Sequence, residues 1–248
     1  MRIATYNIWN SGRGCPERIV HIVETIKALD ADVIGLQEVN EAAWDAISEA
    51  FPNHEKCHFL YRGDDEGLTF VSKYPIIKTR FLNCDPEYPT DALIITADVD
   101  GKEIDFATFH LTWNSEEKRM CEITNLERFL KTQSGKIQFA LGDMNCSEDS
   151  SVYRFLCEEC SPRWRDLVRE YSKTKPGFDK EYSLDYTKNP RWRDEPCSDD
   201  PFFADRVFAR GCDDAFRLKY GFLFGKEIYP ETGLCASDHY GVCFEVVI

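Results

Sequence analysis

Polar residues interrupt the hydrophobic pattern of this chain where its predicted strands end. The clearest example is residues 137–141, which are apolar apart from one Gln and predict a buried strand. The run stops at Gly142, and Asp143 and Asn145 follow it. If the strand geometry continues, alternate side chains place Asp143 and Asn145 on the same side. Such a pair suits a water, a metal ion or a phosphate, and the turn preferences of Asp and Asn explain it equally well.

Similar patterns predict the elements along the rest of the chain. Alternating or continuously apolar runs predict strands at residues 2–10, 32–39, 55–62, 67–72, 202–209 and 242–248, and a hairpin at residues 92–111 that turns at Asp100-Gly101. Apolar stripes at helical spacing predict helices at residues 16–29, 40–51 and 114–132, and a short helix is expected at residues 147–160. Asn40 and Asn114 are the expected N-caps, the second in a capping box with Glu117.

Residues 163–200 predict long loops that mix Lys and Arg with Trp and Tyr. A loop of this length in a compact chain is more often functional than idle. Aromatic and basic side chains together suit a base or a lipid headgroup. A solvated surface loop is nearly as good an explanation.

Side chains that carry chemistry recur at the predicted strand ends. A buried Glu at a strand end is costly unless it is paired or binds a cation, and imidazole carries protons near neutral pH. Each residue alone is more simply a turn, cap or rim residue. Open sheets gather such ends at one edge, so together they predict one site built from Asn7, Glu38, His110, Asp143, Asn145, Asp205, Asp238 and His239.

Length and composition predict a single domain over residues 1–248. With 43% apolar residues the chain can bury a large core, and it has no linker and no internal repeat. It has no apolar run of 18 residues, which excludes a transmembrane span, and no secretory pattern at its start. We therefore expect a monomeric cytoplasmic protein, or a nuclear one if it is eukaryotic. The eleven cysteines then predict reduced thiols, and Cys157-x-x-Cys160 lacks two further ligands for zinc.

The net charge of −14 restricts the partners of the chain. Broad binding to a nucleic-acid backbone depends on clustered Lys and Arg, so it is not expected outside a local basic cleft. An acidic protein that acts on a phosphodiester needs metal ions to offset the repulsion.

Seven motifs resemble those of the endonuclease/exonuclease/phosphatase superfamily, which has the deoxyribonuclease-I-like fold. In order, they are TYNIWN, LQEV, GLTFVSKYP, FATFHL, ALGDMN, ADRVFA and ASDHYGV, and they cover nearly the whole chain. The resemblance implies an α/β fold, a four-layer α/β/β/α sandwich of two mixed β-sheets with helices on the outside. It also implies a site that lies across the top of both sheets.

The resemblance further implies a Mg²⁺ site and in-line attack of water on a phosphate ester. Glu38 would be the main metal ligand, with Asn7 and Asp238 nearby, and Mn²⁺ would be a possible substitute. This fits the preference of Mg²⁺ for few carboxylates and retained water. Asp143 would orient or deprotonate the attacking water, and Asn145 would donate to a phosphate oxygen.

The same resemblance assigns roles to the remaining polar residues. His239, oriented by Asp205, would contact the phosphate or transfer a proton. His110 would stabilise or protonate the other side of the phosphate. Separately from the resemblance, Glu66 lies just before the predicted strand at residues 67–72, where pairing with His110 and a surface carboxylate are equally good explanations.

The layout is most similar to the 5′-tyrosyl-DNA phosphodiesterase branch. The similarity rests on the motifs TFHL, YSLDYTKNPRW, ADRVFAR and SDHYGV. It implies a nucleic-acid substrate contacted by Asn145, Tyr182 and Trp192, although that branch usually has Trp where this chain has Leu184. Sphingomyelinases share much of the layout, but the chain lacks a secretion signal and an apolar membrane hairpin. The alternatives are therefore a lipid phosphodiesterase, another phosphatase of this fold, or a non-catalytic binding domain.

Overall fold

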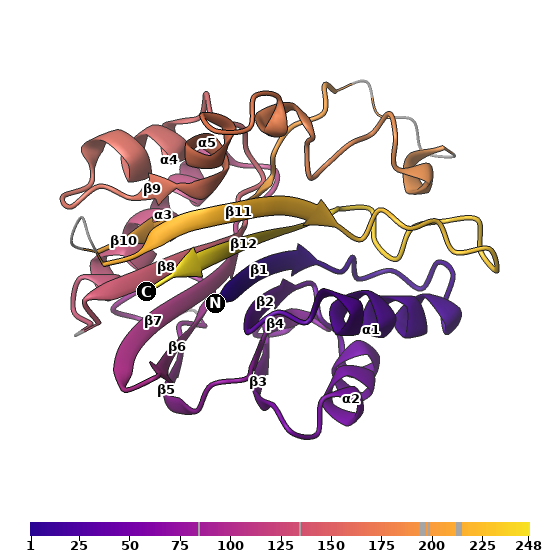
Figure 1. Cartoon of the computed structure of the whole chain (residues 1–248), viewed down its shortest axis with the longest axis horizontal. Helices are drawn as coiled ribbons and strands as arrows, with labels where there is room; N and C mark the ends of the chain where they lie inside the picture. The colour runs from indigo at the N-terminus through magenta and orange to yellow at the C-terminus, as the bar shows by residue number, and fades with distance from the viewer. Residues whose placement is uncertain (84, 134, 194–196, 198, 212–214) are drawn as a thin grey trace.

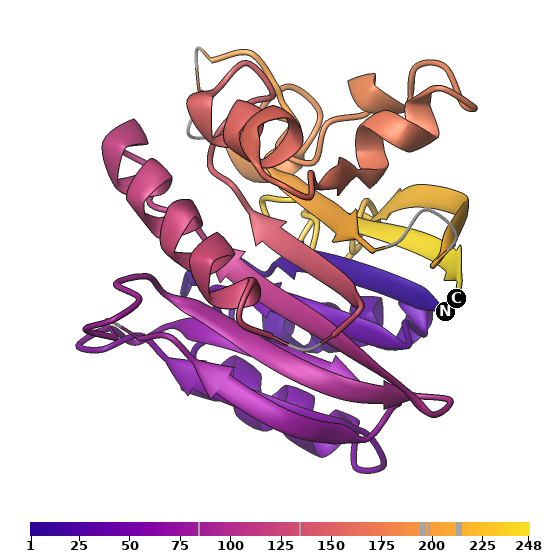
Figure 2. The same ribbon diagram turned by 90° about the vertical axis from the view of Figure 1, so that its left-hand side faces the viewer.

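Two six-stranded β-sheets pack face to face and carry helices on their outer faces (Figure 1; Figure 2). This computed structural model describes residues 1–83, 85–133, 135–193, 197, 199–211 and 215–248. The two termini lie side by side, and the amino group of Met1 donates to the carbonyl oxygen of Val246 at 2.8 Å. None of the helices in the described ranges is long and apolar enough to cross a membrane.

The first sheet has the strand order β11-β12-β1-β2-β4-β3. Its strands are β1 (Arg2–Asn7), β2 (Val33–Gln37), β3 (Glu55–Leu60), β4 (Gly67–Ser72), β11 (Arg217–Phe224) and β12 (Gly241–Val247). β1 and β2 are parallel and the other neighbours are antiparallel. The carboxyl ends of β1 and β2 therefore lie at the same edge, where Asn7 and Glu38 are found.

The second sheet has the order β5-β6-β7-β8-β10-β9. Its strands are β5 (Ile76–Phe81), β6 (Ala92–Val99), β7 (Lys102–His110), β8 (Ile137–Asp143), β9 (Arg165–Asp166) and β10 (Asp205–Arg210). Only β7 and β8 form a parallel pair among these neighbours. Both sheets are thus mixed, as expected. The β6–β7 hairpin turns at Asp100 and Gly101, which both have positive φ, as a type I′ turn requires.

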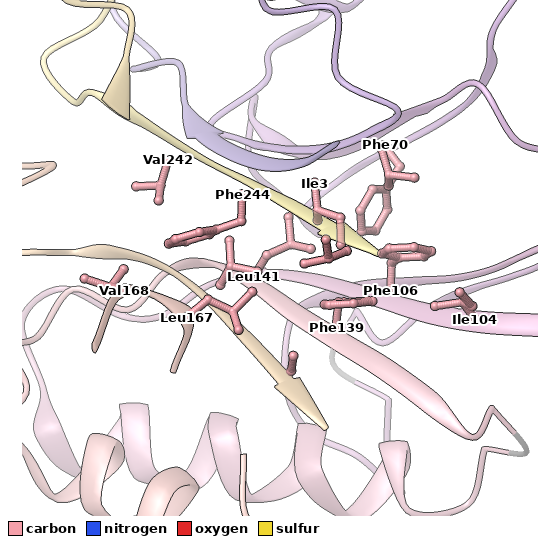
Figure 3. Packing of buried hydrophobic residues seen from close by; sticks show 14 of the residues in the cluster. Ile3, Phe70, Ile104, Phe106, Phe139, Leu141, Leu167, Val168, Val242 and Phe244 are labelled. Atoms are coloured by element: carbon pink, nitrogen blue, oxygen red, sulfur yellow. The ribbon is translucent and has the colours of Figure 1, made fainter. Parts of the chain in front are cut away.

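A continuous apolar core fills the space between the sheets (Figure 3). Ile3 and Phe244 of the first sheet meet Phe106, Phe139 and Leu141 of the second. The sheets also approach closely at Gly35, where a Cβ would lie 2.6 Å from Cδ1 of Leu141. The relative position of the sheets is therefore fixed by packing a few residues from the predicted site.

The helices complete the four-layer sandwich. On the first sheet lie α1 (Glu17–Leu29) and α2 (Glu41–Ala50), whose buried residues share a cluster with Ala4, Ile34 and Cys243. On the second sheet lie α3 (Glu116–Leu130) and α4 (Ser151–Arg154), packed on Ala107, Ala140 and Phe208. A further short helix is α5 (Leu167–Ser172). The predicted α/β fold is confirmed.

Several local predictions were wrong. The N-cap of α3 is Ser115 and not Asn114, because Ser115 has the extended backbone and accepts from the amide of Lys118 at 3.3 Å. Two strands, β5 and β11, were not predicted from the pattern. β5 is largely exposed, and a bulge between Leu218 and Tyr220 interrupts the alternation of β11. Part of the segment expected to be loops forms β9, α5 and two 3₁₀ turns, while residues 194–196 and 198 lie outside the described residues.

The cysteines are unpaired in the part of the chain that the structure describes. Cys157 and Cys160 are separate thiols at the end of the turn that follows α4. Burial raises the pKa of Cys160 to about 12 and that of Cys157 to about 11. Both therefore stay protonated near neutral pH, which does not favour metal binding.

Candidate active site

The register of the second sheet lines up three of the expected site residues. His110 of β7 pairs with Asp143 of β8, and Asp143 pairs in turn with Asp205 of β10. Neighbouring strands lie about 4.8 Å apart, so the three side chains stand in a row across one sheet edge. Gly142 lets β7 and β8 close up beside them, because a Cβ there would lie 2.0 Å from the carbonyl oxygen of Phe109.

Asn7 joins this row to the first sheet. Its Nδ2 donates to Oδ2 of Asp143 at 3.0 Å and to Oε1 of Glu38 at 2.8 Å. The other carboxylate oxygen of Glu38 accepts from the backbone N–H of Asn10 at 2.7 Å. Glu38 has a φ of 59°, a strained conformation for a residue with a side chain, and it directs the carboxylate into the site. Asn7, Glu38 and Asp143 are thus brought together from two sheets.

His239 and Asp205 form a buried pair behind Asp143. Nδ1 of His239 donates to Oδ2 of Asp205 at 2.8 Å, and Nε2 of His239 lies 3.8 Å from Oδ2 of Asp143. Burial alone would lower the pKa of His239. The carboxylates of Asp205, Asp238 and Asp143 outweigh burial and raise the pKa of His239 well above its usual value. The imidazole is therefore oriented by one carboxylate and presents its other nitrogen to the site.

His110 lies on the opposite side of Asp143. Its Nε2 lies 3.6 Å from Oδ2 of Asp143 and 3.8 Å from Oε1 of Glu38. Glu66 is near this group, since burial and the charge of Glu38 raise the pKa of Glu66 to about 7 while His110 opposes the rise. The nearest carboxylates measured from His110 are those of Asp143 and Glu38, so the pairing with Glu66 is an electrostatic interaction at longer range.

Asp238 reaches the site from the loop before β12. Burial raises its pKa to about 6, and repulsion from Glu38 and Asp143 adds to the rise. The loop is tied to the end of β1, because the hydroxyl of Ser237 donates to the carbonyl oxygen of Asn7 at 2.7 Å. Asp238 therefore lies close enough to the other carboxylates for their charges to interact.

This donor set fits a divalent cation. Several buried carboxylates repel one another here, and Oδ1 of Asp205 has no hydrogen-bond partner among the described residues. Ligand atoms of Asp143, Asp205 and His239 also lie within 4.8 Å of one another. Because Nδ1 of His239 and Oδ2 of Asp205 are bonded to each other, this trio suits proton transfer better than a metal. The carboxylate oxygens of Glu38 and Asp238 are the hard ligands that Mg²⁺ prefers. Asn7 turns its amide nitrogen to Glu38, and its oxygen accepts from the N–H of Trp9 at 2.9 Å, so its part in a metal site remains a prediction.

The backbone turns sharply after Asp143. β8 ends there, and Asn145 has a φ of 48°. The N–H of Asn145 donates to Oδ1 of Asp143 at 2.8 Å, and its Nδ2 donates to the carbonyl oxygen of Leu111 at 2.9 Å. The strand geometry therefore does not continue to Asn145. A role for this amide at a phosphate remains a prediction.

The expected substrate contacts lie in the segment before β10. Tyr182 packs against Phe203 with ring centroids 6.5 Å apart. Nε1 of Trp192 donates to the carbonyl oxygen of Asp238 at 3.3 Å, and its ring meets Tyr186 edge-on at 4.8 Å. Leu184 is buried in a bridge to Phe202. Contact of Tyr182 or Trp192 with a substrate remains a prediction.

Sequence reasoning missed Gln37 and Ser183. Gln37 links the sheets, because its Nε2 donates to Oγ1 of Thr108 at 2.7 Å and its Oε1 accepts from Oγ1 of Thr5 at 3.2 Å. Oγ of Ser183 accepts from the backbone N–H of Asp205 at 2.9 Å. A Gln at the end of an apolar strand could have been recognised from the sequence as a candidate site residue. A single Ser in a polar segment could not.

The fold is shared with solved structures of low sequence identity. D. rerio TDP2 complexed with a single strand DNA product superimposes with a TM-score of 0.81 at 17% identity, over 100% of this chain and 99% of that one. A mannosyl-6-phosphatase of Bacteroides thetaiotaomicron gives 0.75 at 17% identity over 100% of both chains. An endonuclease/exonuclease/phosphatase protein of Bacteroides vulgatus gives 0.77 at 17% identity, over 100% of this chain and 98% of that one. At this identity these likenesses show the fold alone.

Sequence comparison with curated proteins and with family models gives different results. No curated protein matches this chain. The family model described as Endonuclease/Exonuclease/phosphatase family matches residues 4–239, a range that includes every site residue described above. Together with the two mixed sheets, this match shows that the chain belongs to the endonuclease/exonuclease/phosphatase family.

Proposed function

We propose that the protein is a Mg²⁺-dependent phosphodiesterase that hydrolyses a nucleic-acid phosphodiester, with DNA ends as the preferred substrate. Members of the family are hydrolases of phosphate esters that generally depend on divalent metals. The observation that carries the proposal is the bridge from Asn7 to both Glu38 and Asp143, with an imidazole on each side. A scaffold domain would have no need of so many converging buried charges.

The proposed metal site comprises Glu38, Asn7 and Asp238. A bound Mg²⁺ would neutralise charge on the phosphate and help to place it. Without the positive charge of the metal ion, the carboxylates of Glu38, Asp143 and Asp238 would repel the phosphate of the substrate. Burial raises the pKa of Asp238 and the charge of Glu38 adds to the rise, so a cation beside the two carboxylates would stabilise their ionised forms.

The proposed chemistry is in-line attack of water on phosphorus. Asp143 orients the water and accepts its proton as the new P–O bond forms. The opposite P–O bond breaks, and the leaving oxygen takes a proton from an imidazole. The Nε2 atoms of His110 and His239 lie 3.6 Å and 3.8 Å from Oδ2 of Asp143. The two imidazoles would therefore contact the phosphate and protonate the leaving group. Asn145 would donate to a phosphate oxygen.

A nucleic-acid substrate is supported by the fold and by one surface residue. The TDP2 neighbour is described with a single strand DNA product. In this chain Trp113 follows β7 three residues after His110, and it is 75% exposed. An exposed aromatic ring three residues along the chain from His110 is a candidate for stacking on a base.

The test compares four substrates with Mg²⁺ and with EDTA. They are a 5′-phosphotyrosyl oligonucleotide, the same oligonucleotide without the tyrosyl group, sphingomyelin and mannose 6-phosphate. We expect Mg²⁺-dependent turnover of an oligonucleotide, and none in EDTA. Preference for sphingomyelin would assign the site to a lipid, and binding of the oligonucleotide without turnover would assign a binding domain.

A sugar phosphatase is the second candidate function. It is favoured by the mannosyl-6-phosphatase neighbour, which covers the whole of both chains. Turnover of mannose 6-phosphate at a higher kcat/KM than either oligonucleotide would replace our proposal with this one. Glu38→Ala, Asp143→Ala and His239→Ala should abolish turnover of whichever substrate is preferred.

A further inference from the structure

The polar segment at residues 183–192 is wrapped around the loop that carries Asp238 and His239. Nδ2 of Asn189 donates to the carbonyl oxygens of Ser237 at 3.0 Å and of Asp238 at 2.9 Å. Trp192 adds the bond to the carbonyl of Asp238 described above. Nε of Arg191 donates to the carbonyl oxygen of Cys235 at 2.8 Å. Three side chains within four residues therefore hold this loop through its backbone.

The same segment also holds Asp205, the partner of His239. The hydroxyl of Ser183 accepts from the N–H of Asp205, as described above. The carbonyl oxygen of Ser183 accepts from the N–H of Tyr240 at 2.7 Å. Ser183 thus contacts the backbone of Asp205 and that of the residue after His239. One segment sets both ends of the 2.8 Å pair between His239 and Asp205.

Asn189 is the most constrained member of this segment. It is 2% exposed, and its N–H donates to the carbonyl oxygen of Asp185 at 3.0 Å. Oδ1 of Asn189 accepts from the N–H of Arg191 at 3.0 Å. Every polar atom of the side chain is therefore used, two hydrogens as donors and one oxygen as an acceptor. Only a side-chain amide supplies this combination.

We propose that Asn189 is a positioning residue, which places Asp238 and His239 by holding two successive carbonyls of their loop. The role rests on the function proposed above. Asp238 is a proposed metal ligand and His239 a proposed proton carrier, so a shift of the loop would change metal binding and chemistry together. Misplacement of a reacting group by about 1 Å can cost about 10²-fold in rate.

The chain offers a matched control for Asn189. Asn125 lies on α3, is 7% exposed, and also donates Nδ2 to a backbone carbonyl, that of Pro89, at 3.3 Å. Asn189→Asp and Asn125→Asp both put a carboxylate oxygen opposite a carbonyl at a buried position. The two variants should lose thermal stability alike, but only Asn189→Asp alters the loop at the site.

The experiment measures three quantities in the full-length wild type and both variants. For Asn189→Asp we expect kcat to fall about 10- to 100-fold with KM little changed, and Mg²⁺ binding by calorimetry to weaken. We also expect the downfield proton resonance of Nδ1–H of His239 to shift, because its bond to Asp205 is disturbed. Asn125→Asp should leave all three quantities as in the wild type at a temperature where it is folded.

Equal losses in Asn189→Asp and Asn125→Asp would overturn the proposal, because they would show a purely structural role. An unchanged kcat, Mg²⁺ affinity and His239 resonance in Asn189→Asp would overturn it as well. If the wild type hydrolyses no phosphate ester, the function proposed above fails by itself. The His239 resonance then still decides whether Asn189 places the loop.

Discussion

His239 and Asp205 are held 2.8 Å apart by a hydrogen bond between Nδ1 and Oδ2, and both side chains are almost completely buried. Asp205 begins β10 of the second sheet, and His239 lies in the loop before β12 of the first sheet. The bond fixes which nitrogen of the imidazole faces Asp143. It is the same logic by which a carboxylate orients the catalytic histidine in hydrolytic triads.

Asp205→Asn should reduce hydrolysis by about 10²-fold or more, because an amide no longer favours the Nδ1–H tautomer and the charged imidazole. It also removes a charge that raises the pKa of His239. A His239 that acts as an acid loses activity as the pH rises through its pKa. The alkaline limb of the pH–kcat profile should therefore move to lower pH in the variant.

The control for this prediction is Asp105→Asn. Asp105 is 1% exposed in the same sheet and accepts from Oγ1 of Thr96 at 2.7 Å and from Nε2 of Gln138 at 3.0 Å. It lies toward the opposite end of β7 from His110. The variant should lower stability and keep the wild-type pH profile. An unchanged profile in Asp205→Asn would remove His239 from the proton transfer.

Glu38→Gln should weaken metal use more than it disturbs the fold. An amide oxygen can still accept from Nδ2 of Asn7, but the amide nitrogen cannot accept from the N–H of Asn10. We expect turnover at limiting Mg²⁺ to fall about 10²-fold and to recover in part at higher Mg²⁺ or with Mn²⁺. A titration of rate against metal concentration measures this. Full activity of the wild type in EDTA would contradict the metal assignment.

The strand-end residues could be predicted because each has a local signal, an apolar run that stops at a polar side chain. This was sufficient to select Asn7, Glu38, His110 and Asp143 as candidates, which the structure brings together. The register that aligns His110, Asp143 and Asp205 joins residues far apart in the chain, so no local pattern contains it. The fold itself followed from the motif order more than from periodicity.

The parts that could not be predicted depend on contacts at long range. The hold of Asn189 on Ser237 and Asp238 spans 48 and 49 residues, and a lone Asn in a polar segment gives no sign of it. β11 was missed because a bulge shifts the alternation of its side chains. The cap of α3 was placed one residue early, because Asn114 and Ser115 are both good caps and only the backbone angles decide between them.

Trp113→Ala should weaken binding of an oligonucleotide and leave the chemistry intact. The backbone at Trp113 is held in place, because Nη1 of Arg119 donates to the carbonyl oxygens of Thr112 and Trp113, each at 2.9 Å. The N–H of Leu111 donates to the carbonyl oxygen of Asp143 at 2.9 Å, which ties the loop to β8. The ring is thus exposed, and the backbone that carries it is held by hydrogen bonds.

Stacking of one base contributes about 1–3 kcal/mol, so KM for the oligonucleotide should rise about 10-fold or more with kcat little changed. Trp113→Phe should restore most of the loss, because it keeps an aromatic face. Steady-state kinetics on the oligonucleotide and on a small aliphatic phosphodiester separate binding from chemistry. A rise of KM for both substrates alike would mean that Trp113 shapes the site and does not stack.

The buried pair of Glu127 and Arg210 should stabilise the fold without acting in the site. Nη1 of Arg210 donates to both carboxylate oxygens of Glu127 at 2.8 Å, and Nε1 of Trp164 donates to Oε2 of Glu127 at 2.9 Å. Arg210 pairs with Gln138, five residues before Asp143 along β8, or about 17 Å from the site.

Glu127→Ala leaves the guanidinium of Arg210 buried without its carboxylate, so the free energy of unfolding should fall by about 3–5 kcal/mol. Glu127→Leu combined with Arg210→Met removes both charges and should cost less than Glu127→Ala. Urea unfolding measures the free energy, and kcat of the folded fraction should remain at the wild-type value in both variants. A loss below about 1 kcal/mol in Glu127→Ala would mean that water reaches Arg210 and replaces the carboxylate, since only an uncompensated buried charge carries the larger cost.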